Sequence, residues 1–232
     1  MLFRSLPDRI EVRHDCELSD EQRKLYLAEL RRSREQIQQA VAQQGVAKSR
    51  MHVLAALTRL RQICCHPSLV GNDTASGKTE TLFELLEPLL AQGHKVLVFS
   101  QFVQMLKLLE AECVARKIPT HSLTGLTKER QEVVQAFQND PNPCVFLLSL
   151  RAAGTGLNLT TASYVVLYDP WWNPAVEAQA IDRTHRIGQT RPVFAYRIVA
   201  RDTIEERILE LQQSKRDLAE AILGQDNAVI AN

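Results

Sequence analysis

The sequence predicts an α/β fold in which helices cover both faces of a parallel β-sheet. From about residue 75 to residue 200, short apolar runs alternate with segments of helical periodicity. Runs such as Cys144–Ser149 and Tyr164–Tyr168 lack the polar alternation of a strand that faces water on one side. Strands of that kind are buried on both faces, as in parallel sheets with helices packed above and below.

Composition restricts the class of protein. The chain has 232 residues, of which 45% are hydrophobic and 24% charged, as in ordinary globular domains. The formal net charge is +1, so any basic surface must be local. We find no signal peptide and no apolar run of the ~20 residues that a membrane span needs, so we expect neither secretion nor a membrane partner. Five cysteines without CxxC spacing favour a reducing compartment over a disulfide framework or a zinc cluster.

The first third of the chain is predicted to be helical. A capping box at Ser19–Gln22 begins a helix that continues to about Gln44. A second helix covers Ser49–Cys65 and ends before a His-Pro pair. We therefore expect residues 1–75 to form a helical segment that ends in a linker.

After the linker we expect one α/β domain over residues 76–200, and a terminal helix and tail over 201–232. The last helix is predicted to start at Asp202–Glu205 and to end before Gly224. In chain order, the predicted elements of the α/β domain are helix Thr79–Gln92, strand Lys95–Phe99, helix Phe102–Arg116, strand Thr120–Leu123, helix Lys128–Gln138 capped by Thr127, strands Cys144–Ser149 and Tyr164–Tyr168, helix Ala175–Ile187 and strand Val193–Val199.

Two arginines are the strongest candidates for chemistry. Arg183 and Arg186 are three residues apart on the predicted helix Ala175–Ile187, one turn after Gln179. Guanidinium groups match phosphate oxygens, and the loops at strand ends are where α/β sheets bind ligands. The pair therefore predicts a phosphoryl-binding group. The alternative is a solvated basic helix face, which the helix dipole would also favour.

A glycine-containing loop follows the strand Cys144–Ser149. Gly154 and Gly156 would let the backbone approach a ligand and expose amides to an anion, and Arg151 adds positive charge. A tight strand-to-helix turn explains the glycines equally well.

One apparent nucleotide motif is interpreted as structural. Ser76–Thr79 ends like a P-loop and contains Lys78, but five residues rather than four separate Gly71 from Gly77, and a helix precedes it instead of a buried strand. Asp20–Arg23 likewise reads as a helix cap rather than a magnesium-binding acidic pair. The sequence therefore predicts neither a complete ATP site nor a metal site.

Further positions could contact nucleic acid. Both tryptophans lie in Asp169–Pro174, and we expect at least one to pack in the core, while the other could meet a sugar or base. Short polar residues at two other strand ends could hold backbone phosphates: Ser100 and Gln101 after one strand, and Thr124 and Gly125 with Arg130 after the next.

Taken together, these segments resemble the second RecA-like lobe of the Swi/Snf family of DNA-translocating ATPases, in helicase superfamily two. The order-preserving set of matching segments is Leu60–Cys64 with His66-Pro67, Lys95–Phe102, Leu123–Gly125 with Arg130 and Phe137, Ser149–Thr160, Asp169–Pro174, Gln179–Gln189 and Asp202–Ile208. One departure is Arg151–Gly154, which reads RAAG where the family usually has AGG.

The resemblance implies roles for these residues. Arg183 and Arg186 would be arginine fingers that reach ATP with Mg²⁺ held mainly by a first lobe, and Gly154, Gly156 and Gln179 would lie close to that ATP. The segment 1–75 would be the family's helical protrusion, and the opening is shorter than the family's usual lead-in, so we expect the first lobe upstream. The residues expected to contact double-stranded DNA are Ser100, Gln101, Thr124, Gly125, Arg130, Ser149, Arg151, Asn158 and Trp172.

The resemblance predicts one half of an ATP-driven translocase of double-stranded DNA, inactive as an ATPase by itself. Its partners would be the first lobe, DNA and a DNA-bound protein target. Its location would be the cytoplasm or nucleoid of a bacterium, or the nucleus of a eukaryote. The alternative from another class is a non-catalytic RecA-like docking module for DNA or protein. A small phosphate-binding enzyme is a third option, which no nucleophile or acid–base pair supports.

Overall fold

Six parallel strands form the sheet of this protein in the computed structural model, which describes residues 6–153 and 156–214. Their order is β1-β6-β5-β2-β4-β3. The bounds are β1 (Arg9–Cys16), β2 (Val96–Ser100), β3 (Thr120–Leu123), β4 (Val145–Ser149), β5 (Tyr164–Leu167) and β6 (Val193–Ala200). The predicted parallel α/β architecture is confirmed.

Alternate residues of the central strands belong to two separate hydrophobic cores. Val96 and Val98 of β2 pack in one core, whereas Leu97 and Phe99 pack in the other. Helices α3 (Gly77–Ala91) and α4 (Val103–Ala115) supply side chains to the first core, and α5 (Arg130–Asn139) and α7 (Pro174–Ile181) supply them to the second. Burial on both faces explains why these strands are apolar without alternation. The helices are α1 (Asp20–Lys48), α2 (Arg50–Cys65), the 3₁₀ turn η1 (Pro67–Val70), α3 (Gly77–Ala91), α4 (Val103–Ala115), α5 (Arg130–Asn139), α6 (Leu150–Ala153) and α7 (Pro174–Ile181), and residues 204–214 are also helical.

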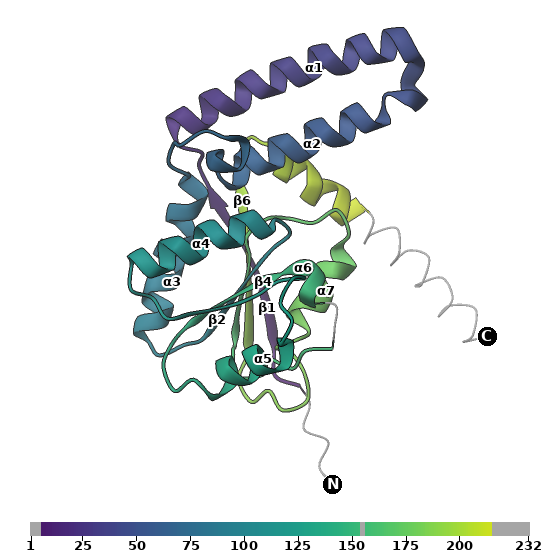
Figure 1. Cartoon of the computed structure of the whole chain (residues 1–232). Coiled ribbons are helices and arrows are strands. Elements are labelled where there is room, and N and C mark those ends of the chain that lie inside the picture. The colour runs from purple at the N-terminus through teal and green to yellow at the C-terminus, as the bar shows by residue number, and fades with distance from the viewer. Residues whose placement is uncertain (1–5, 154–155, 215–232) are drawn as a thin grey trace, which may run out of the picture.

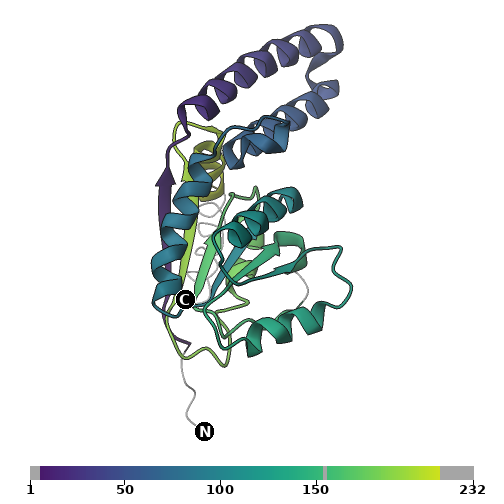
Figure 2. The same ribbon diagram turned by 60° about the vertical axis from the view of Figure 1, so that its left-hand side comes forward.

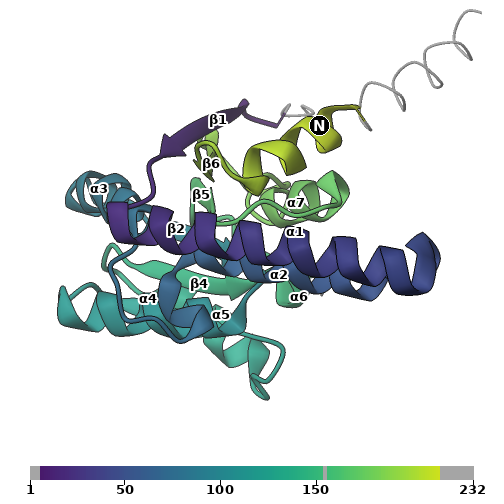
Figure 3. The same cartoon turned by 90° about the horizontal axis from the view of Figure 1, so that it is seen from above.

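Helices α1 and α2 lie side by side and project beyond the sheet (Figures 1, 2 and 3). We call this pair the helical protrusion. The predicted capping box is present, because Ser19 Oγ accepts a hydrogen bond from Gln22 N and Gln22 Oε1 accepts one from Ser19 N, both at 3.3 Å. Gly45 interrupts the helical backbone of α1 with φ 77° and ψ 166°, where the sequence predicted its end. Within the described ranges, we find no helix with both the length and the apolar character to cross a membrane.

The strand β1 is an element that the prediction of a helical segment over residues 1–75 left out. It pairs in parallel with β6, from Arg9 opposite Val193 to Cys16 opposite Ala200. Its polar residues lie at the edge of the sheet, and its partner is more than 180 residues away, so local periodicity gave little indication of it. Part of the segment 1–75 thus belongs to the sheet.

Two predicted helix boundaries are also wrong. Helix α7 ends at Ile181, so Arg183 and Arg186 lie in the turns that follow and not on a helix face. Thr184 Oγ1 donates to the Ile181 carbonyl at 2.6 Å, which satisfies a carbonyl at the end of the helix. Helix α5 begins at Arg130, because Thr127 Oγ1 accepts from Thr124 N in a turn instead of capping the helix.

Candidate functional site

The carboxyl ends of β2, β4 and β5 bring part of the candidate set to one edge of the sheet, where Gln101, Arg151 and Trp172 follow the three strands. Strand β2 lies between β4 and β5, so the chain crosses over β2 on its way from β4 to β5. Ligands of open α/β sheets bind at such a change of direction, outside the carboxyl ends of the strands.

A hollow near the amino ends of β1 and β6 contains one of the two candidate arginines, because Asp182 pairs with Arg9 and His185 contacts Pro7 at the start of β1. We call it the arginine hollow, and its described lining residues are Leu6, Gly156, Asn158, Asp182, His185, Arg186 and Ile187. The Arg186 side chain is exposed, with Nη1 3.5 Å from the Leu157 carbonyl, which is a weak contact. Gly156 has φ +64°, and nothing lies within 4 Å of the position that a Cβ would occupy. An open backbone beside an exposed guanidinium suits an anionic ligand such as a phosphate group.

The other groups of the arginine hollow are held by neighbours. His185 Nε2 lies 2.6 Å from the Pro7 carbonyl, so this nitrogen carries the proton and donates. Asp182 forms an ion pair of 2.9 Å with Arg9. A carboxylate already paired with an arginine is a poor ligand for Mg²⁺, which prefers free carboxylate oxygens and water. The described residues of this hollow therefore fit a phosphate group better than they fit the Mg²⁺ that accompanies ATP.

The other predicted nucleotide-binding residues are distributed differently. Arg183 is half-buried and is not among the described residues that line the arginine hollow, although its carbonyl accepts from Leu159 N at 3.0 Å. Gln179 lines a separate hollow with Gln101 and Arg151. Gly154 lies outside the described residues. The structure thus brings Arg186 and Gly156 together, and leaves Gln179 apart from them.

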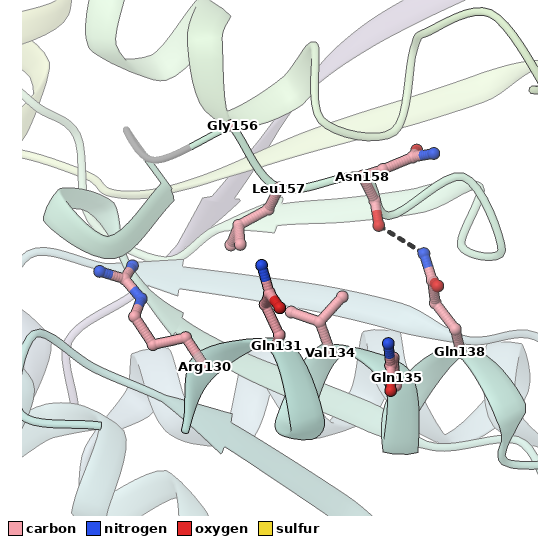
Figure 4. A pocket seen from close by; sticks show the side chains of 8 residues that line it. All are labelled: Arg130, Gln131, Val134, Gln135, Gln138, Gly156, Leu157 and Asn158. Atoms are coloured by element: carbon pink, nitrogen blue, oxygen red, sulfur yellow. Dashed lines mark hydrogen bonds between the residues drawn. The ribbon is translucent and has the colours of Figure 1, made fainter. Parts of the chain in front are cut away.

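A groove along α5, shown in Figure 4, shares two lining residues, Gly156 and Asn158, with the arginine hollow. Gln138 Nε2 donates to the Asn158 carbonyl at 2.5 Å. Arg130 Nη2 donates to the Ala152 carbonyl at 2.8 Å. These contacts attach Ala152 and Asn158, which follow β4 in the chain, to the side chains of α5.

A buried carboxylate connects the ends of β2 and β5. Asp169 is 1% exposed, and it accepts from Ser100 Oγ at 2.5 Å and from Gln101 Nε2 at 2.6 Å. Burial raises the pKa of Asp169 above its usual value, although Arg61 and these hydrogen bonds act in the opposite direction. Ser100 is fully buried and its hydroxyl donates to Asp169, which gives the side chain a structural role, and the DNA contact of Ser100 stays a prediction.

Ser149 is enclosed in the same way, and its DNA contact likewise stays a prediction. It is 3% exposed, and its Oγ accepts from Ala152 N at 3.2 Å, within the turn that follows β4. Both serines are short hydroxyls at strand ends, where they can serve either the turn or a ligand, and only burial distinguishes the two.

The remaining DNA candidates have accessible surface. Arg151, Gly125 and Asn158 are exposed, and Gln101, Thr124 and Trp172 are partly exposed. Thr124 Oγ1 accepts from Leu126 N at 3.3 Å and shapes the turn that contains Gly125. Both tryptophans are half-buried, so neither is fully packed in the core and neither projects fully into solvent.

Sequence reasoning assigned no role to two buried charged residues of this region. Arg61 of α2 is 3% exposed and lies against the tryptophan loop. Glu177 of α7 is fully buried: Oε1 accepts from Trp171 N at 2.8 Å and from Gln212 Nε2 at 3.0 Å, and Oε2 pairs with Arg197 Nε at 3.0 Å. The sequence signal that could have revealed the buried role of Glu177 is its position inside a helix of small apolar residues.

The P-loop-like stretch is structural, as predicted. Lys78 is fully buried and forms an ion pair with Glu205, and its Nζ also donates to the carbonyls of Tyr168 at 3.1 Å and Ile198 at 3.3 Å. A lysine with this environment cannot reach a nucleotide phosphate.

Comparison with known families agrees with this geometry. The model of the helicase conserved C-terminal domain matches residues 77–188, and that of the SNF2-related domain matches residues 2–69. A Sulfolobus solfataricus SWI2/SNF2 ATPase C-terminal domain is 32% identical with a TM-score of 0.75, over 93% of this chain and 90% of that chain. The chain belongs to the SWI2/SNF2 ATPase family. Its fold is that of the RecA-like second lobe.

Other members of the SWI2/SNF2 family are similar over nearly the whole chain. A Sulfolobus solfataricus SWI2/SNF2 ATPase core in complex with dsDNA is 35% identical with a TM-score of 0.78, over 94% of this chain and 47% of that chain. An uncharacterized ATP-dependent helicase of Mycoplasma pneumoniae is 36% identical over 97% of this chain. A SWI/SNF-related matrix-associated actin-dependent regulator of chromatin (subfamily A member 1) of Mus musculus is 37% identical over 97%. The chain spans 22% and 23% of the lengths of these last two relatives.

Proposed function

We propose that this SWI2/SNF2 domain is the second motor lobe of an ATP-driven translocase of double-stranded DNA. The observation that carries the proposal is the exposed Arg186 guanidinium beside the open backbone of Gly156. Since the described residues of the arginine hollow offer a phosphate contact without a fitting metal ligand, ATP and Mg²⁺ would be held mainly by a first lobe. Arg186 would then stabilise the charge that develops on the transferred phosphoryl group, as arginine fingers do.

Arg183 has a supporting part in this proposal. It is half-buried one turn earlier, and its carbonyl holds the start of the next loop segment through Leu159 N. Arg183 is not among the described residues that line the arginine hollow, so we assign the main catalytic contact to Arg186.

The accessible polar residues at the strand ends would contact the DNA backbone. They are Gln101, Thr124, Gly125, Arg151, Asn158 and Trp172, with Arg130 acting through the loop after β4. Contacts to phosphate carry no base information, so we expect binding that depends little on sequence and falls steeply with salt. Alternating closure of the two lobes would move the DNA, and a DNA-bound protein would be the target.

The test is reconstitution of ATP hydrolysis from this chain, its first lobe and double-stranded DNA, measured as phosphate release. We expect no hydrolysis from the chain alone. Arg186→Ala should lower the reconstituted rate by ~10³-fold or more, the scale of other arginine fingers. Arg191→Ala is the matched control, because Arg191 is exposed nearby and contacts the Thr161 carbonyl at 3.2 Å outside the arginine hollow.

Two results would contradict the proposal. ATP hydrolysis by the isolated chain would show that it contains a complete site. An unchanged reconstituted rate in Arg186→Ala, with normal folding and DNA binding, would favour the alternative of a non-catalytic docking module.

A further inference from the structure

A buried guanidinium joins the helical protrusion to the loop that contains both tryptophans. Arg61 lies near the end of α2 and is 3% exposed. Its Nη2 donates to the Pro170 carbonyl at 2.5 Å and lies 3.9 Å from the Asp169 carboxylate. A residue of the protrusion is thus bonded to the segment that directly follows β5.

Three aromatic rings surround this guanidinium. Arg61 Cζ lies 5.2 Å from the centre of the Trp172 ring, and 5.7 Å from the centres of both Trp171 and Phe102. We call Arg61 with these rings the aromatic cage. Each distance is within the range of a cation–π interaction, which strengthens when the cation is removed from water. The cage therefore fixes rings from two loops, one after β2 and one after β5.

The hydrogen bonding of Arg61 is incomplete. Its Nε is buried without a hydrogen-bond partner among the described residues. A buried donor without a partner costs free energy, so the position is not optimised for stability alone. What a guanidinium provides here, and an apolar side chain could not, is a planar cation that holds the Pro170 carbonyl and stacks with aromatic rings.

The end of α2 that carries Arg61 is anchored in the hydrophobic core. Ile63, Cys64 and Cys65, which follow Arg61 in α2, are fully buried. Asp169, beside Arg61, accepts a hydrogen bond from the side chain of Gln101. Helix α2 is therefore connected to Trp172 through the aromatic cage, and to Gln101 through Asp169.

We propose that Arg61 is a positioning residue that sets the placement of Trp172 and Gln101, so that the helical protrusion determines how tightly this domain grips DNA. The inference rests on the proposed function, since it concerns the same DNA-contacting loops. Arg61 is buried and would touch neither DNA nor nucleotide. Its effect is to preorganise two loops that would otherwise have to be ordered when the DNA binds, at a cost in affinity.

The test compares Arg61→Met and Arg61→Lys with Arg59→Met. Arg59 is exposed two residues earlier on α2 and pairs with Glu29 at 3.0 Å, so it controls for loss of a positive charge from the same helix. The first readout uses the chain alone, whose only two tryptophans are both in the cage. Acrylamide quenching of their emission should increase in both Arg61 variants and stay at the wild-type value in Arg59→Met.

The second readout is DNA-dependent ATP hydrolysis by this domain with its first lobe. We expect Arg61→Met to raise the DNA concentration for half-maximal hydrolysis about tenfold, equal to about 1.4 kcal/mol of binding free energy. The maximal rate should change less, because Arg61 lies outside the arginine hollow. A purely structural role would instead lower the fraction of active protein, and with it the maximal rate, without moving the half-maximal concentration.

Wild-type quenching together with a wild-type half-maximal DNA concentration in Arg61→Met would overturn the inference. If Arg61→Met does not fold, Arg61→Lys decides, since it keeps the charge and loses the planar stack. If the wild-type protein shows no DNA-dependent hydrolysis, the proposed function fails. Quenching and direct DNA binding by the chain then still test the role of Arg61.

Discussion

Replacing Lys78 should destabilise the fold severely, and it should not act as a P-loop mutation. The side chains of Lys78 and Glu205 are both completely buried, and they form an ion pair. Glu205 Oε2 also accepts from Ala200 N at 2.9 Å. In Lys78→Met this carboxylate would remain buried without its cation, and the carbonyls of Tyr168 and Ile198 would lose a donor.

The expected loss follows from this burial. Removing one partner of a buried pair costs about 3–5 kcal/mol, a large part of a typical stability of about 5–15 kcal/mol. The matched double variant Lys78→Met/Glu205→Leu should recover much of the loss, because it also removes the unpaired charge. Chemical denaturation followed by circular dichroism measures all three free energies of unfolding.

The pH dependence gives a second signature. Burial lowers and the Glu205 carboxylate raises the pKa of Lys78, with a net increase, whereas burial raises the pKa of Glu205 above 4.5. The raised pKa of Lys78 favours the charged pair, whereas the raised pKa of Glu205 favours a neutral carboxyl group. We infer the charged pair, because Lys78 donates to two carbonyls and Glu205 accepts from Ala200 N. The wild-type contribution of Lys78 is therefore present at neutral pH, and it is lost when strongly alkaline pH deprotonates the lysine.

In Lys78→Met the pKa of Glu205 should rise further, because its cation is gone. Above pH 4.5, the usual value for Glu205, the folded variant then holds a proton that the unfolded chain releases. Stability consequently falls as pH rises through that window, and the deficit should be larger at neutral than at acidic pH. A loss below about 1 kcal/mol, the scale of an exposed ion pair, would refute the reasoning.

Two further predictions concern packing and thiols. In Gly77→Ala the new Cβ would lie 2.1 Å from the backbone oxygen of Glu17, so we expect the free energy of unfolding, measured by urea denaturation, to fall by about 1–3 kcal/mol or more. The control Gly125→Ala meets nothing within 4 Å and should be nearly neutral. Equal stabilities of the two variants would contradict the close fit of α3 against the end of β1. Burial raises the pKa of Cys16 and Cys144 to about 11, so the native protein at pH 8 should react slowly with a thiol reagent and the denatured protein should react fully. Rapid labelling of native protein would contradict this burial, which the structure gives for Cys16, Cys64, Cys65, Cys113 and Cys144.

Much of the architecture could be predicted because it is encoded locally. The capping box at Ser19, the interruption at Gly45 and the continuously apolar strands are properties of short segments, and each is present in the structure. The edge strand β1 was missed because its polar residues and its distant partner β6 give no local signal. The end of α7 was misplaced because Thr184 closes the helix through its own hydroxyl, which helical periodicity does not reveal.

The candidate site divides in the same way. The sequence by itself determined the family and the parallel sheet, because residue type and chain order carry that information. Only the tertiary structure decided which of two equally charged arginines faces open space, that Ser100 and Ser149 are enclosed, and that Arg61 meets both tryptophans. Burial and contact between segments more than a hundred residues apart depend on how the chain packs, and they cannot be read from any one segment.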